Sequence, residues 1–164
     1  FDSADPLYTL DLETSIGLSL QNVGNSVAII TNNKCKFINW SKYTTSEVAE
    51  SGEINIIRKS NAGLLIVFNR ANDRSDNTIV LASNSGKKIK KFKINSSITD
   101  IQYSKGRVYY ISDVNAIILD NDGNLLRNTI CNYGTERFIV IAPNAIATIN
   151  NGEFSKIDIQ KGEN

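Results

Sequence analysis

The chain has 164 residues, a formal net charge of +1, 41% hydrophobic residues and 21% charged residues. This length is enough for one domain with a buried core, and the composition is globular rather than disordered. The near-zero charge excludes a general attraction to nucleic acid or anionic membranes. Because the chain contains no histidine, it cannot hold a Ser-His-Asp triad, a Cys-His dyad or a His-ligated zinc ion.

Short runs of β-branched and aromatic residues, separated by turns rich in Gly, Asn, Asp and Ser, predict β-strands along the whole chain. The predicted strands are, in chain order, 7–12, 17–22, 27–31, 35–40, 44–49, 54–58, 64–68, 78–82, 87–94, 98–103, 108–111, 116–119, 125–130, 138–141, 145–149 and 153–159. Residues 69–77 (NRANDRSDN) are predicted to form the one long polar loop.

The clearest stretch is 98–130, which predicts four antiparallel strands joined by tight turns, including a strong Asp122-Gly123 turn. Such a meander is the unit of a β-propeller blade. The pattern recurs about every 38–42 residues, giving repeats at roughly 15–52, 53–94, 95–131 and 132–160. Strand 7–12 is predicted to close the last blade. We therefore expect a single all-β domain over 1–164 with about four four-stranded blades, forming either a closed small propeller or half of a larger ring.

Two segments, Asn115–Ile130 (NAIILDNDGNLLRNTI) and Thr78–Ile94 (TIVLASNSGKKIKKFKI), resemble the repeats of quinoprotein-like and WD40-like propellers. The chain looks closest to uncharacterised extracytoplasmic propeller domains of low-GC Gram-positive bacteria, which are often tethered by one N-terminal membrane helix. This resemblance implies an extracytoplasmic protein, membrane-tethered or secreted; a cytoplasmic location is the alternative. The Trp that commonly follows the Gly turn of quinoprotein repeats is absent, as is the WD dipeptide of WD40 repeats. These two departures argue against a quinone cofactor and against a role specific to WD40 proteins, and we expect no cofactor.

The predicted loop 69–77 is a candidate binding loop, because long loops on rigid scaffolds often carry function. Its charged residues are Arg70, Asp73, Arg74 and Asp76. A solvated loop without function is the alternative. Trp40, the only tryptophan, is a candidate interface anchor, and packing within the core is the alternative.

A second charge cluster lies in predicted strand 87–94. Its lysines could bind phosphate or an anionic surface, or could guard an outer strand against edge pairing; they are Lys87, Lys88, Lys90, Lys91 and Lys93. The turn Asp120–Asn124 spaces its oxygens like the start of a calcium loop, but position 12 of that loop would be Cys131 rather than Glu. A hairpin turn is therefore the favoured interpretation.

Cys35 and Cys131 are too far apart in sequence for a CxxC motif, so they form either a disulfide or two free thiols. No catalytic or cofactor motif is recognised. We expect a non-enzymatic scaffold that binds another protein or itself to complete a ring, without nucleic acid, and with membrane contact only through a tether outside this chain. The alternatives are an extracytoplasmic sensor for a wall polymer or peptide, and a cofactor-binding propeller enzyme without histidine.

The absence of methionine, including at position 1, leads us to expect a processed chain or an excised domain. No apolar run approaches the roughly 20 residues of a membrane span, and no signal peptide is recognised.

Overall fold

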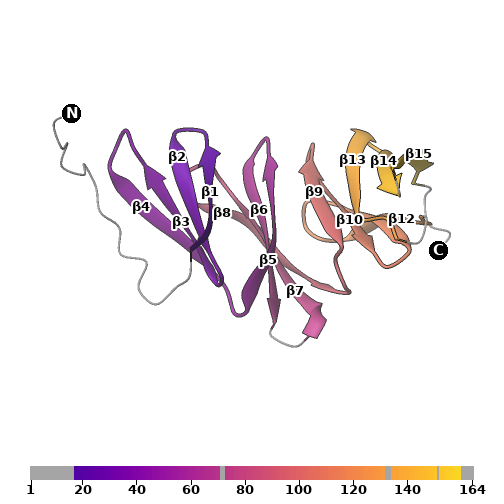
Figure 1. Cartoon of the computed structure of the whole chain (residues 1–164), viewed down its shortest axis with the longest axis horizontal. Helices are drawn as coiled ribbons and strands as arrows, with labels where there is room; N and C mark the ends of the chain where they lie inside the picture. Colours follow the sequence, from indigo (N-terminus) through magenta and orange to yellow (C-terminus); the bar gives the residue numbers. More distant parts are fainter. Residues whose placement is uncertain (1–16, 71–72, 132–133, 151, 160–164) are drawn as a thin grey trace.

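A computed structural model describes residues 17–70, 73–131, 134–150 and 152–159. These residues form 15 β-strands and four antiparallel sheets, and they contain no helix that could span a membrane (Figure 1). The predicted all-β, propeller-like fold is therefore confirmed. The predicted closing strand 7–12 lies outside the described residues.

The strands follow one another within each sheet, so that every sheet is a meander. Sheet 1 contains β1 (Gly17–Val23), β2 (Ser26–Thr31), β3 (Lys34–Asn39) and β4 (Thr44–Ala49). Sheet 2 contains β5 (Glu53–Ser60), β6 (Gly63–Arg70), β7 (Asp73–Ala82) and β8 (Lys88–Asn95). Sheet 3 contains β9 (Asp100–Ser104), β10 (Arg107–Ser112), β11 (Asn115–Leu119) and β12 (Leu125–Ile130). Sheet 4 contains β13 (Arg137–Ala142), β14 (Ala145–Asn150) and β15 (Glu153–Asp158).

The four sheets stand side by side as an open arc. Sheet 1 lies at one end of the molecule and sheet 4 at the other (Figure 1). The first strands of sheets 2, 3 and 4 contact one another in sequence, β5 with β9 and β9 with β13. The described residues therefore form an open arc and not a closed small propeller. That this arc is half of a larger ring stays a prediction.

Each pair of neighbouring sheets buries its own hydrophobic cluster, because alternate residues of a strand point to opposite faces. We call the face that a sheet turns toward the next sheet its forward face, and the opposite one its back face. Forward residues of sheet 1, including Phe37, pack on back residues of sheet 2, including Phe68. The same relation joins Leu65 of sheet 2 to Val108 of sheet 3, and Tyr109 of sheet 3 to Ile146 of sheet 4.

The predicted loop 69–77 is wrong. Strand β6 continues to Arg70 and β7 begins at Asp73, so both strands extend into the polar stretch. Asn69 pairs with Asn77 across the ladder, and the Asn69 side-chain amide donates to Asn77 Oδ1 at 3.1 Å. Asn77 is fully buried and donates to two backbone carbonyls, so buried polar groups that are hydrogen-bonded support this strand in place of apolar ones.

The two cysteines are free thiols and lie in different hydrophobic clusters. Cys35 is buried between sheets 1 and 2, whereas Cys131 is buried between sheets 3 and 4. A disulfide between them within one chain is therefore excluded. Burial raises the pKa of the Cys35 thiol to about 12, which keeps it protonated and unreactive at neutral pH.

Candidate functional site

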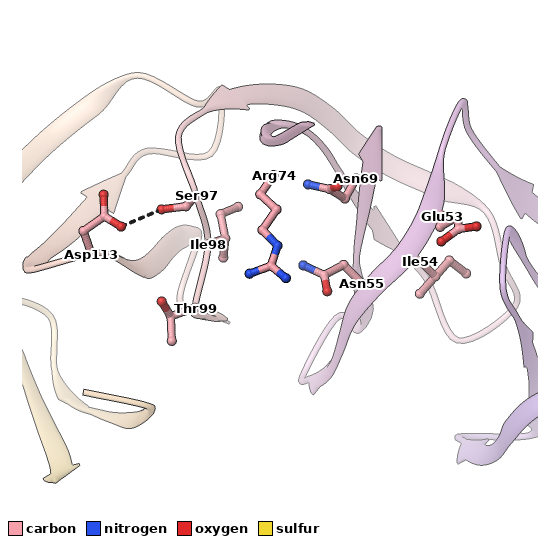
Figure 2. Close-up of a pocket in the computed structure, with 9 residues that line it drawn as sticks. All are labelled: Glu53, Ile54, Asn55, Asn69, Arg74, Ser97, Ile98, Thr99 and Asp113. Atoms are coloured by element: carbon pink, nitrogen blue, oxygen red, sulfur yellow. Dashed lines mark hydrogen bonds between the residues drawn. The ribbon is translucent and has the colours of Figure 1, made fainter. Parts of the chain in front are cut away.

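A polar pocket of about 740 Å³ opens between sheets 2 and 3. Sheet 2 contributes residues from β5, β6 and β7, and the segment before β9 and the β10–β11 turn complete the wall. The lining residues are Glu53, Ile54, Asn55, Asn69, Arg74, Ser97, Ile98, Thr99 and Asp113. Figure 2 shows Arg74 extending between the residues of sheet 2 and those of the sheet 3 side.

A glycine next to the pocket lets two strands of its wall come close together. Gly52 precedes β5 and has a φ of +114°, a conformation that side-chain-bearing residues rarely adopt. A Cβ at this position would lie 2.3 Å from the backbone oxygen of Asn69. Gly52 therefore allows the start of β5 to approach the end of β6, which places Glu53 and Asn69 in one wall.

Three of the four charged residues of the predicted binding loop have partners on or near their own hairpin, and the fourth lines the pocket. Arg70 Nη1 lies 3.8 Å from Asp76 Oδ2, and Lys93 Nζ lies 3.7 Å from Asp76 Oδ1. Asp73 accepts hydrogen bonds from the Ser75 hydroxyl at 2.6 Å and the Ser75 backbone N–H at 2.9 Å, which together lower its pKa. Within the described part of the chain, the Arg74 guanidinium has no acidic partner. Of the four residues, only Arg74 lines the pocket. A binding role for the quartet as a whole stays a prediction.

The remaining pocket residues were not recognised from the sequence. Asp113 has a φ of +52° in the β10–β11 turn, and its Oδ1 accepts a hydrogen bond from Ser97 Oγ at 3.0 Å (Figure 2). Asp113 and Glu53 are separated by 60 positions in the sequence and line one pocket only because sheets 2 and 3 stack. No short motif could have indicated this grouping.

The lysines of β8 occupy the outer strand of sheet 2, and most of them face carboxylates. Lys88 lies 2.7 Å and Lys91 2.5 Å from the Glu50 carboxylate, and Lys90 lies 2.7 Å from Asp122. Lys93 Nζ lies 3.7 Å from Asp76 Oδ1. Of the five lysines in the predicted cluster, only Lys87, which precedes β8, has no acidic partner among the described residues. These pairs satisfy much of the strand's charge, and its anion-binding role stays a prediction.

Glu50 supplies a pH-dependent link between sheets 1 and 2. Burial alone would raise its pKa, but the hydrogen bonds from Lys88 and Lys91 outweigh burial and hold the pKa below its usual 4.5. Because the folded pKa is lowered, the stabilisation is present above about pH 4.5 and is lost as the pH falls through the folded value.

We expect Glu50→Gln to lower the free energy of unfolding by about 1 kcal/mol at pH 7, because the lysines are partly exposed and solvent screens the pairs. Urea denaturation at several pH values measures this difference, which should shrink below about pH 4.5. Glu136→Gln is the matched control, since Glu136 is exposed and has no ion pair among the described residues. A difference that persists unchanged at pH 3 would contradict this assignment.

The structure places Trp40 at the surface. Trp40 is 45% exposed just after β3, so it does not pack in the core; its role as an interface anchor stays a prediction.

The Asp120–Asn124 turn is held by hydrogen bonds to its first residue. Asp120 Oδ1 accepts hydrogen bonds from the backbone N–H groups of Asp122 and Asn124 at 2.8 and 2.9 Å. The turn is thus a capped hairpin, and no cluster of three potential metal ligands occurs in the described segments.

A buried carboxylate joins the inner strands of sheets 2, 3 and 4. Asp100 at the start of β9 is 1% exposed, and its Oδ1 lies 2.7 Å from Arg58 Nη2 of β5. Its Oδ2 accepts a hydrogen bond from the Phe138 N–H of β13 at 3.2 Å. Gln102, two residues further along β9, donates to the Phe138 carbonyl and accepts from the Val140 N–H. Two alternating polar residues of β9, Asp100 and Gln102, therefore form side-chain hydrogen bonds with backbone groups of β13.

Four consecutive meanders, with the first strands of sheets 2, 3 and 4 in contact, define a propeller-type fold. No protein-family model and no curated protein matches the sequence.

Solved structures match in fold. A protein of unknown function from Bacteroides caccae matches with a TM-score of 0.55 at 12% identity, over 92% of this chain and 63% of that one. BamB from Moraxella catarrhalis matches with a TM-score of 0.53 at 10% identity, over 84% of this chain and 41% of that one. The extracellular domain of the putative one-component system BT4673 from B. thetaiotaomicron matches with a TM-score of 0.56 at 13% identity, over 90% of this chain and 22% of that one. The chain thus spans less than two thirds of each of these structures, and the likeness is one of fold.

Proposed function

We propose that the chain is a non-enzymatic propeller scaffold that completes its ring with a second copy of itself. The observation that carries this proposal is the forward face of sheet 4. Its strand pairing places alternate residues on this face, as in the buried forward faces of sheets 1 to 3, yet its large apolar residues are exposed. Ile139 is 51%, Ile149 41% and Phe154 72% exposed, and Ile149 and Phe154 are direct partners across β14 and β15.

The back face of sheet 1 is a suitable partner for this surface. Leu20, which is 70% exposed, pairs with Ile29, and Val27 pairs with Ile38 on the same face. Within the arc, each forward face packs on the back face of the next sheet. A second copy would continue that arrangement, with sheet 4 of each copy on sheet 1 of the other.

Two copies would form two equivalent contacts related by a two-fold axis, which closes the assembly. The match with BamB supports this stoichiometry, because 84% of this chain matches only 41% of BamB. The similarity to an extracellular domain supports the further proposal that the scaffold works outside the cytoplasm.

We expect the double substitution Ile149→Lys and Phe154→Lys to weaken self-association by more than about a hundredfold, because it removes apolar burial at both contacts of the ring. Analytical ultracentrifugation over a dilution series measures the change. Leu20→Asp should weaken association similarly from the opposite face. Leu125→Lys, on the 63% exposed residue of outer strand β12, is the matched control and should leave association unchanged.

The outcome for Leu20→Asp identifies the docking partner. If the sheet 4 variant dissociates the assembly and Leu20→Asp does not, sheet 1 of a second copy is not the docking surface, and the proposal is wrong. Equal effects of all three variants would also contradict it, since Leu125 lies on neither face.

A further inference from the structure

We propose that the pocket between sheets 2 and 3 binds a short peptide with a free amino end and a free carboxyl end. Arg74 would bind the carboxylate, and Glu53 or Asp113 would bind the ammonium group. The pocket lies between two sheets of one chain, so this inference is independent of the proposed ring closure.

The carboxylate is assigned to Arg74 because, among the described lining residues, it is the only cation, and it has no acidic partner within the described segments. A guanidinium presents a planar pair of N–H donors that matches a carboxylate. Figure 2 shows the Arg74 side chain reaching across the pocket beside Asn55, with Ser97 and Thr99 on the opposite wall.

The ammonium group is assigned from the arrangement of charge around Arg74. Glu53 and Asp113 belong to opposite walls of the pocket, and Arg74 lies between them in Figure 2. With one cation and two carboxylates, the lining carries an excess of negative charge. A dianion such as phosphate would be repelled by this excess, whereas a zwitterion complements both signs.

The remaining groups suit a peptide backbone. The side-chain amides of Asn55 and Asn69 and the hydroxyl of Thr99 can donate and accept hydrogen bonds, as peptide groups do. Ile54 and Ile98 add apolar contact for small side chains. A volume of about 740 Å³ is within the range of pockets that hold small-molecule ligands.

The test uses tri-alanine as the probe and amide chemical shifts of the intact chain as the readout. Addition of tri-alanine should shift the signals of Asn55, Arg74 and Thr99 in a saturable manner. Tri-alanine amide, which lacks the carboxylate, should bind at least about tenfold more weakly, which corresponds to about 1.4 kcal/mol. N-acetyl-tri-alanine, which lacks the ammonium group, should bind several-fold more weakly.

Arg74→Gln should weaken binding of tri-alanine by at least about tenfold and should abolish the difference between acid and amide. Arg70→Gln is the matched control, because Arg70 is on the same hairpin, is exposed and does not line the pocket. Unchanged shifts elsewhere in the spectrum show that Arg74→Gln folds.

Three results would overturn the proposal. They are equal binding of the acid and the amide, absence of shifts at the pocket, and displacement of tri-alanine by an equal concentration of inorganic phosphate. The last result would identify a general anion site in place of a peptide site.

Discussion

Asp100→Ala should lower the free energy of unfolding by about 3–5 kcal/mol, since it removes one partner of a buried ion pair. The substitution leaves the Arg58 guanidinium without its counter-ion, and the guanidinium side chain is only 29% exposed. It also leaves the N–H groups of Ile101 and Phe138 without their acceptor. Because Asp100 contacts β5 and β13 from β9, the loss affects three sheets together.

Denaturation with guanidinium chloride measures this loss. The denaturant concentration at the unfolding midpoint should fall, and the dependence of the free energy of unfolding on denaturant concentration should stay unchanged. Asp100→Asn keeps the shape and one acceptor oxygen, so we expect a smaller loss of about 2 kcal/mol. Asp113→Asn is the matched control, because Asp113 is exposed and Asn tolerates its positive φ. A loss below about 0.5 kcal/mol for Asp100→Ala, the range of ordinary surface substitutions, would show that the ion pair and hydrogen bonds of Asp100 contribute little.

Phe68→Ala should cost about 3–5 kcal/mol through the cavity that it creates. Phe68 is 0% exposed and lies in the cluster between sheets 1 and 2, where it packs with residues of both sheets. Phe68→Leu keeps most of the volume and should cost less. Thermal unfolding followed by circular dichroism measures both effects.

Leu125→Ala controls for the general effect of truncating a large apolar side chain, because Leu125 is 63% exposed. We expect this control to change the free energy of unfolding by no more than about 0.5 kcal/mol. If Phe68→Ala were as mild as Leu125→Ala, the two sheets would not share a common core.

The strands could be predicted from the sequence because their signals are local. Val108–Ile111 is a dense β-branched and aromatic run, and strand β10 is observed at Arg107–Ser112. The Asp122-Gly123 turn likewise leads into β12 at Leu125, as predicted. The failure at 69–77 has a local cause too. Its polar composition is typical of a loop, but Asn69 and Asn77 hydrogen-bond across the ladder and maintain the strands.

The site could not be predicted, because its residues meet only through the stacking of sheets. Arg58 and Asp100 are 42 positions apart. Glu53 and Asp113 share a pocket although they belong to different sheets. A charge cluster in the sequence also does not show which charge is paired: Arg70 and Arg74 are equivalent by composition, yet only Arg70 has an acidic partner among the described residues.

The mass of the unmodified chain in solution tests the central claim most directly. Sedimentation equilibrium at micromolar concentration should give twice the chain mass of 18.1 kDa, with no larger species, because two four-sheet arcs close on each other. A mass of 18.1 kDa at every concentration would contradict the proposed ring. A series of species that grows with concentration would contradict it as well, since the contact would then propagate without closing.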